Sequence, residues 1–434
     1  MIDVFYKTIH HFFPKLSVWL NSIDDPRVKK TTYSTGHLLW IGIFLFLVRL
    51  GSKRQIKYLL STDEFKKNLK LISSSPTHKI PHPDTLENLL KKIKPEEIAG
   101  IRQKMIARLI RMKCLVAFRL LGIYYMIAID GTGHITYKER HCPHCLTKTK
   151  NGKVIYYYHN VLEAKIVTEG GLALSVETEF IENRNGATKQ DCELKAFYRL
   201  TKKLKRKFPQ LKMCLLLDSL YVADPVFEIC DRYSWKYIIT FKEGSMPDTY
   251  AEYLCLKDLQ PENRAEIKDE DTTQNFSWVN SISYRGPVFD VLECNESKPG
   301  SKGEIENTKF VWITNLNVDS NNFKKIAKGG RLRWKIENEG FNIQKNGGYN
   351  LEHPYSKNER AMKNFYLLLQ IAHIISQLIE KGSLLKDKIA KVFGSIANVF
   401  RQLLEDLRTK LLSLEEINSY LSSPFQIRLS SPPP

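Results

Sequence analysis

YYMIAIDGTG, residues 124–133, is an apolar run that ends in an acid and a turn, and it divides the chain into two patterns. Up to about residue 120 the apolar residues are spaced as in helices, whereas beyond it short apolar runs alternate with amphipathic stretches. A run of this length, bounded by glycine and threonine, predicts a buried strand that ends at Asp130. The sequence therefore places the start of an α/β region here.

The segments that follow this strand keep a definite order. Two further strands are predicted by VIYYYHNVLEAKIV (154–167) and LALSVETEFIEN (172–183), and two more by MCLLLDSLY (213–221) and WKYIITFK (235–242). Between them, DCELKAFYRLTKKLKRKF (191–208) and ADPVFEICDRY (223–233) predict helices. Three strands, helix, strand, helix, strand is the order of a ribonuclease-H-like fold, so we predict an α/β chain with a ribonuclease-H-like mixed sheet.

We divide the chain into five parts by composition and pattern. They are an all-helical, basic domain (1–120), the first part of an α/β core (121–243), a β-rich insertion (244–307), the second part of the core (308–381), and a C-terminal helical segment with a disordered SSPPP tail (382–434). The strand-like pieces FSWVNSISY and PVFDVLECN lead us to expect strands in the insertion.

Charge indicates the kind of partner. The chain has 66 Lys and Arg against 47 Asp and Glu, a net charge of +19, and residues 1–120 hold 22 basic and 9 acidic residues, or +13. Such a surplus favours a nucleic acid as partner, the alternative being a basic protein without one. The longest apolar run, LLWIGIFLFLV at 38–48, is shorter than the ~20 residues of a membrane-spanning helix. We expect a buried helix there and no membrane partner.

Two acids end strands, and a third acid lies on a later helix. Asp130 follows MIAI and Asp218 follows CLLL, while the stretch RLRWKIENEGFNIQK, 331–345, carries Glu337 and Glu339. A single acid after a strand often only begins a turn. Two of them with a helical glutamate favour a site for Mg²⁺, which prefers oxygen ligands. Two such ions ~3.5–4 Å apart promote in-line phosphoryl transfer.

Three short motifs resemble those of a known family. IAIDGT at 127–132, LLLDSLY at 215–221 and RWKIE at 333–337 are similar to motifs of the DDE transposases of bacterial insertion sequences, in the group with a Tyr–Arg–Glu–Lys signature. The resemblance implies a ribonuclease-H-like core with a β-rich insertion and two Mg²⁺ ions, for which Mn²⁺ can substitute. It implies double-stranded DNA as partner, both transposon ends and target, with cleavage of the ends and joining of the 3′ hydroxyl to the target. We expect a dimer, at least on DNA.

The resemblance also assigns roles to individual residues. It implies that Asp130, Asp218 and Glu337 are the catalytic metal ligands and that Arg333 is the signature arginine, in contact with DNA. Two positions depart from the signature, since Gly330 replaces the tyrosine and Gln344 replaces the lysine. Lys345, one residue later, becomes the candidate contact to phosphate.

An aromatic residue of the insertion is a further candidate for DNA contact. Transposases of this group can use such a residue to stack on a flipped base, and Trp278 lies in the corresponding part of this chain. The alternative is a tryptophan of the core.

Helix geometry favours Glu337 over Glu339 as the third ligand. Residues three and four apart share a helix face, so Glu337 lies with Arg333, Trp334 and Phe341. The same spacing pairs Glu339 with Lys335, a common surface ion pair of small value.

The stretch HCPHC, residues 141–145, has the Cys-x-x-Cys spacing of zinc sites, and His159 follows nearby. Structural zinc usually takes four ligands from two such pairs, and the sequence has no second pair. We therefore expect ordinary thiols in a β-turn rather than structural Zn²⁺. The eight cysteines are scattered, which favours a reducing cytoplasm, and DNA as partner favours association with the bacterial nucleoid.

Three functions fit these observations. The first is an active transposase, the second is a transposase-derived DNA-binding protein without catalysis, and the third is a ribonuclease-H-like nuclease with other substrates. All three acids are present, which favours the first over the second. The basic helical domain and the insertion favour it over the third.

Overall fold

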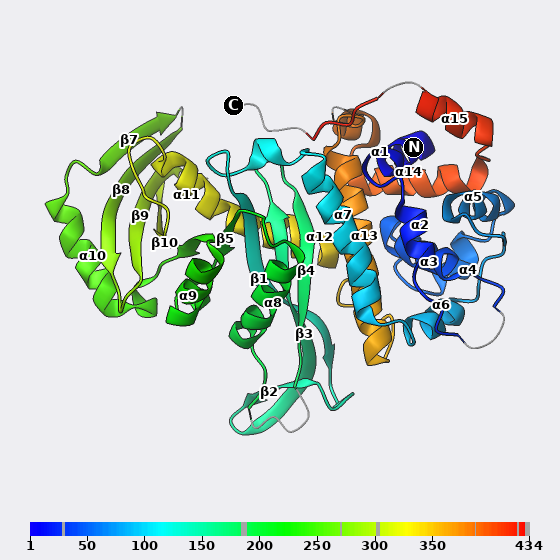
Figure 1. Ribbon diagram of the computed structural model, residues 1–434, viewed down its shortest axis with the longest axis horizontal. Coiled ribbons are helices and arrows are strands. Elements are labelled where there is room, and N and C mark those ends of the chain that lie inside the picture. Colours follow the sequence, from blue (N-terminus) through cyan, green and yellow to red (C-terminus); the bar gives the residue numbers. More distant parts are fainter. Residues whose placement is uncertain are drawn as a thin grey trace.

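The computed structural model describes residues 1–27, 31–183, 189–269, 271–300, 304–386, 388–422 and 425–429. The tail that we expected to be disordered, 430–434, lies outside them. The fold is α/β, with one mixed 10-stranded sheet and helices at both ends of it (Figure 1). The predicted fold class is thus confirmed at this level.

The middle of the sheet contains the elements predicted from residue 124 onward. They are β1 (Tyr125–Tyr137), β3 (Lys153–Val167), β4 (Ala173–Ile181), α8 (Glu193–Lys207), β5 (Met213–Leu217), α9 (Asp224–Tyr233) and β6 (Lys236–Thr240). Strand β3 pairs antiparallel with both β1 and β4, whereas β1–β5 and β5–β6 are parallel pairs. A short strand that we did not predict, β2 (Leu146–Lys150), pairs with β3 and forms a hairpin with it.

The expected insertion extends the same sheet. It contains α10 (Pro247–Leu259), β7 (Arg264–Asp269), β8 (Thr272–Ser283) and β9 (Val288–Pro299), and β10 (Ile305–Thr314) then returns to the core. Because β10 pairs with both β9 and β6, the strand order runs without a break as β2-β3-β1-β5-β6-β10-β9-β8-β7. The boundary that we placed at residue 307 therefore falls inside a strand, and helix α10 was not predicted.

Helices from both ends of the chain form one body beside the sheet (Figure 1). The N-terminal ones are α1 (Ile2–Phe12), α2 (Leu16–Asn21), α3 (Thr35–Leu47), α4 (Gln55–Leu59), α5 (Asp63–Ser73), α6 (Pro83–Leu90) and α7 (Pro95–Arg111). The C-terminal ones are α13 (Glu359–Lys381), α14 (Ile396–Thr409) and α15 (Leu414–Ser422). Every residue of α3 is buried, as predicted, and α3 packs against α13.

Polar contacts tie the two sets of helices together. The side-chain amide of Asn68 on α5 donates hydrogen bonds to the carbonyl oxygens of Leu407 (3.0 Å) and Lys410 (2.7 Å). The predicted helical domain 1–120 therefore shares its core with the end of the chain. Among the described residues, no helix is both long enough and apolar enough to cross a membrane.

Candidate active site

Strands β1 and β5 bring Asp130 and Asp218 to the same place. The two strands are parallel neighbours, and their last register pair is Ala128 with Leu216, two residues before each acid. Ala128 and Leu216 belong to one core cluster, together with Ile336. Since side chains alternate along a strand, both acids point toward the face of the sheet on which Ile336 lies.

The third acid comes from an irregular helical segment on that face. We predicted one helix over 331–345, but its hydrogen-bond pattern changes from α11 (Phe323–Arg331) through a 3₁₀ turn, η4 (Leu332–Trp334), to a π-helical segment, η5 (Ile336–Asn342), and then α12 (Ile343–Asn346). Short π-helical segments are frequent at functional sites. Glu337 lies in η5 and lines a cavity of about 480 Å³ together with Asp130.

The two neighbouring glutamates have different surroundings. Glu339 forms the predicted ion pair with Lys335, at 2.9 Å between Oε1 and Nζ. Glu337 has no cationic partner among the residues that the structure describes, and its charge acts on Asp130. Phe341 of the expected face is buried, although Glu337 itself is the more exposed of the two glutamates. The pairing is confirmed, and the role of Glu337 as a ligand stays a prediction.

Asp130 lies in an electrostatically crowded position. Burial raises its pKa to about 6, and the charges of Asp218 and Glu337 act in the same direction. The Arg333 guanidinium, 3.4 Å from Oδ2, and the Gly131 N–H, which donates to Oδ1 at 2.9 Å, oppose this rise in pKa. Negative charge thus exceeds positive charge around these acids, which is the condition that a bound cation relieves.

A fourth carboxylate, which the sequence argument missed, lies beside these three acids. Glu193 is the first residue of α8, and a Cβ atom added to Gly131 would lie 2.3 Å from Glu193 Oε1. Burial raises the pKa of Glu193 to about 7, and the charges of Asp130 and Asp218 add to the rise. We call Asp130, Asp218, Glu193 and Glu337 the four-acid site.

We did not predict a role for Glu193, because an acid in the first turn of a helix has an ordinary explanation, its favourable interaction with the helix dipole. A signal for it was nevertheless present. Helix α8 leads directly into β5, so its first turn returns to the end of β5 where Asp218 lies.

Cations and an exposed aromatic ring lie next to the four-acid site. A second cavity, about 500 Å³, is lined by Asp218, Lys242, Arg333 and Trp334, among others. The Arg333 guanidinium lies 4.7 Å from the centre of the Trp334 ring, and this tryptophan is 52% exposed. Lys345 lines the cavity shared by Asp130 and Glu337 and pairs with Glu352 at 2.8 Å. Each of the two cavities beside the acids is therefore lined by at least one cation.

Local packing explains both departures from the transposase signature. A Cβ atom at Gly330 would lie 2.6 Å from Trp312 Nε1, so a tyrosine has no room there. The Gln344 side chain is buried and donates to Gln370 Oε1 at 2.9 Å, so a lysine at this position would enter the core. The cation at the cavity is Lys345 instead.

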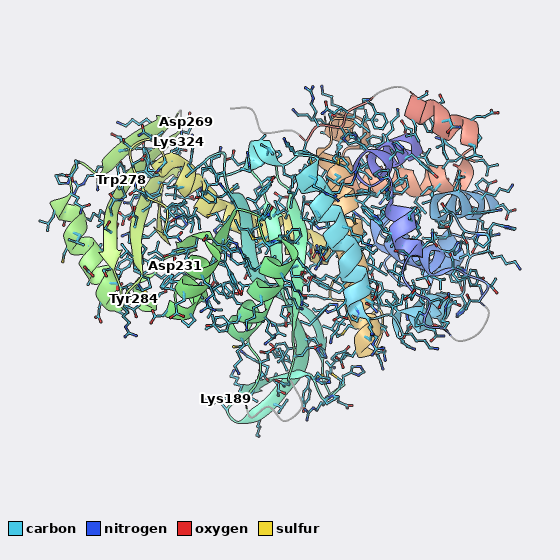
Figure 2. All side chains as sticks on the ribbon, in the orientation of Figure 1. Lys189, Asp231, Asp269, Trp278, Tyr284 and Lys324 are labelled. Atoms are coloured by element: carbon cyan, nitrogen blue, oxygen red, sulfur yellow. The ribbon has the colours of Figure 1, made fainter. Side chains whose placement is uncertain are left out.

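Trp278 does not lie beside the four-acid site. It is on β8, in the outer part of the sheet (Figure 2), it is buried, and its ring stacks on Phe323 with 5.3 Å between ring centres. This position fits the alternative that we gave, a core residue. The exposed tryptophan that lines a cavity with Asp218 is Trp334.

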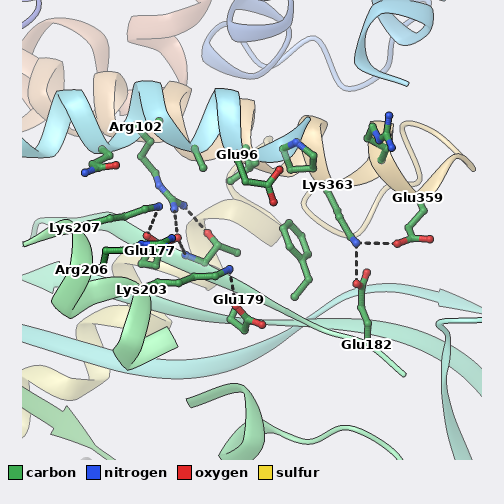
Figure 3. A pocket seen from close by; sticks show the side chains of 18 of the residues that line it. Glu96, Arg102, Glu177, Glu179, Glu182, Lys203, Arg206, Lys207, Glu359 and Lys363 are labelled. Carbon is green, nitrogen blue, oxygen red and sulfur yellow. Dashed lines mark hydrogen bonds and ion pairs between the residues drawn. The ribbon is translucent and has the colours of Figure 1, made fainter. Parts of the chain in front are cut away.

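A larger cavity, about 850 Å³, lies between α7, α8, β4 and α13 and has a different chemistry (Figure 3). Its carboxylates are paired, since Lys203 contacts Glu179 at 2.6 Å and Lys363 contacts both Glu182 (2.7 Å) and Glu359 (2.8 Å). Seven lysines and arginines and five glutamates line this cavity, so its surplus is positive, whereas the surplus of the four-acid site is negative.

Known proteins add nothing to this geometry, because no family model and no curated protein matches the chain.

Proposed function

We propose that this chain is a DNA transposase that binds transposon ends, cuts them and joins them to target DNA by two-metal phosphoryl transfer. The observation that carries the proposal is the convergence of four carboxylates from β1, the end of β5, α8 and η5. Among the described residues, Arg333 is the one cation that forms an ion pair with any of them.

The topology of the sheet supports the ribonuclease-H-like part of the proposal. The order β4-β3-β1-β5-β6, with antiparallel pairing on one side of β1 and parallel pairing on the other, agrees with the strand sequence expected for that fold. Asp218 directly follows β5, whereas Asp130 lies inside β1, which continues to Tyr137 and does not end at the acid as we predicted.

The donor set suits hard divalent cations. Carboxylate oxygens are the ligands that Mg²⁺ and Mn²⁺ prefer, and Asp130, Asp218 and Glu337 would hold them, with Glu193 as a further donor. When bound, two such ions activate the attacking oxygen and stabilise the leaving oxygen.

Neighbouring groups of the chain orient the acids and receive the DNA. Arg333 and the Gly131 N–H hold the two oxygens of Asp130, and the Leu220 N–H donates to Asp218 Oδ1 at 2.9 Å. Because Arg333 and Lys345 line two different cavities beside the acids, each can contact a backbone phosphate of the bound DNA.

The basic helical region supplies the remaining affinity in this proposal. Its net charge of +13 over residues 1–120 would attract backbone phosphates, and counterion release would make binding fall steeply with added salt. Joining two ends requires at least two copies of the chain on DNA.

The test is a cleavage assay with the full-length chain. The substrate is a supercoiled plasmid carrying the DNA that flanks the reading frame on both sides, with Mg²⁺ or Mn²⁺, and Asp218→Asn serves as control. Cuts at the borders of the element, followed by joining, support a transposase. Cuts without preference indicate the nuclease, and binding without cuts by the wild type indicates the DNA-binding protein.

A further inference from the structure

The HCPHC turn and a residue of β3 bring three metal-binding atoms together, away from the four-acid site. Cys142 Sγ and Cys145 Sγ lie 3.4 Å apart, and each lies 3.4 Å from His159 Nε2. Among the described residues, these three form the one group of at least three His, Cys, Asp or Glu whose ligand atoms all lie within 4.8 Å of one another, as the ligands of a single small ion do.

The pairing of the strands explains why these residues meet. Leu146, the first residue of β2, is the register partner of Tyr158 on β3. The residue before Leu146 therefore faces the residue after Tyr158, which places Cys145 beside His159. The turn Cys142–Cys145 is closed by a hydrogen bond from the Cys145 N–H to the Cys142 carbonyl, at 3.4 Å. This turn places the two thiols side by side.

We propose that Cys142, Cys145 and His159 bind a zinc ion through three protein ligands. The centre of a triangle with 3.4 Å sides lies about 2.0 Å (3.4/√3) from each corner. Zinc bonds are about 2.0–2.1 Å to nitrogen and about 2.3 Å to sulfur, so an ion slightly outside the plane reaches all three atoms. Two thiolates and an imidazole are a donor set that zinc prefers and Mg²⁺ does not.

A water molecule would complete the coordination. The two other histidines of the turn already bind backbone oxygens, since His141 Nε2 lies 2.5 Å from the Lys357 carbonyl and His144 Nδ1 lies 2.7 Å from that of Asn183. Cys142 is only partly buried, so solvent can reach the ion. Our expectation of ordinary thiols rested on the missing second Cys-x-x-Cys pair, and His159 takes the place of one of its members.

The position of the zinc gives it a mechanical role. The hairpin of β2 and β3 projects from the body of the molecule (Figure 1), and its outer residues Val154 and Ile155 are exposed. His159 is the register partner of Ile135 on β1, the strand that carries Asp130. A zinc ion would tie the HCPHC turn to β3, at the level where β3 pairs with the strand that carries Asp130. The proposal does not depend on the transposase function.

The first test is the metal content of the full-length protein, purified without chelators and then dialysed against buffer with Mg²⁺. Elemental mass spectrometry should find about one zinc ion per chain. Cys142→Ser, Cys145→Ser and His159→Asn should lose it. Cys192→Ser and Cys255→Ser, which change exposed thiols elsewhere, should keep it, as should Asp130→Asn. Full zinc in Cys142→Ser and Cys145→Ser would overturn the proposal.

A second measurement uses only the folded wild type, in case the variants do not fold. A mercurial thiol reagent should release zinc to a chromogenic chelator, and Co²⁺ in its place should show a thiolate-to-metal charge-transfer band. A wild-type protein that holds no zinc and takes up neither Zn²⁺ nor Co²⁺ contradicts the proposal. So does a disulfide between Cys142 and Cys145 in protein purified under reducing conditions.

Discussion

Two groups of acids lie on neighbouring strands of this sheet and have opposite surroundings. Asp130 on β1 and Glu163 on β3 are direct register partners. Asp130 belongs to the four-acid site, whereas Glu163 belongs to a buried set of charges that we call the Arg102 network, consisting of Arg102, Glu163, Lys165, Glu177 and Lys207.

The Arg102 network provides both of its acids with partners. Arg102 and Glu163 are completely buried, and the Arg102 guanidinium lies 3.8 Å from Glu163 and 3.3 Å from Glu177. Lys207 adds an ion pair to Glu177 at 2.6 Å, and the Ser175 hydroxyl donates to Glu163 at 2.7 Å. Each acid of the network thus has a cation, a hydroxyl donor or both.

The four-acid site leaves its charges unbalanced, because among the described residues one cation, Arg333, forms an ion pair there, and it does so with Asp130. Buried charges are normally paired, since desolvation is costly. The fold pairs Glu163 with two cations but leaves a surplus of negative charge at Asp130 and its neighbours. Such a surplus is expected where a cation binds. The comparison predicts that the Arg102 network matters for stability and the four-acid site for activity.

The largest effect should come from the metal ligands. Asp130→Asn, Asp218→Asn and Glu337→Gln keep side-chain size but remove a charge, so each should abolish Mg²⁺-dependent nicking of the plasmid. Folding and DNA binding, followed by thermal melting and gel shift, should be nearly unchanged, because each variant loses one charge from a site with a surplus of negative charge, and Asp130→Asn weakens one ion pair besides, to Arg333. Wild-type nicking by all three variants would refute the site.

Arg102→Met should have the opposite profile. It leaves Glu163 and Glu177 with less positive charge in a buried position, which should lower the free energy of unfolding by about 3–5 kcal/mol. Urea denaturation measures this. Lys203→Met, which removes a partly exposed ion pair to Glu179, is the control and should cost about 0–1 kcal/mol. If Arg102→Met is as stable as the wild type, the network is not structural.

Glu193→Gln should reduce nicking by about 10–100-fold, as expected for a residue that supports metal ligands. Gly131→Ala should do the same, because its Cβ would displace the Glu193 carboxylate. Gly133→Ala is the control for an alanine on the same strand, since the atoms nearest to its added Cβ would lie 3.9 and 4.0 Å away. Glu193→Gln and Gly131→Ala should both need more Mg²⁺ for the half-maximal rate. If their Mg²⁺ requirement is unchanged, Glu193 does not belong to the site.

The smallest effect should come from Glu339→Gln. It removes the ion pair to Lys335, which is worth about 0.3–0.5 kcal/mol in a helix, and nicking should continue at the wild-type rate. If instead Glu339→Gln is inactive and Glu337→Gln is active, our choice of glutamate is wrong by two residues.

Strand order and the first two acids could be predicted from the sequence because apolar runs that end in Asp are local signals. The continuous sheet could not, since the pairing of β10 with β6 joins residues about 70 apart and leaves no local pattern. The π-helical turn at Glu337 and the position of Glu193 beside Gly131 are likewise products of packing. His159 stands 14 residues from Cys145, so only the register of β2 and β3 reveals that they meet.

The packing of α3 against α13 has a consequence for the synthesis of the protein on the ribosome. From the end of α3 at Leu47 to the end of α13 at Lys381 the ribosome must add 334 residues (381 − 47), which takes roughly 17–67 s at about 5–20 residues per second. During that time a largely apolar helix, every residue of which is buried in the finished fold, lacks its partner α13. Nascent chains should therefore recruit chaperones early. A truncated product of residues 1–120 should aggregate rather than stay in solution and compete with the full-length protein.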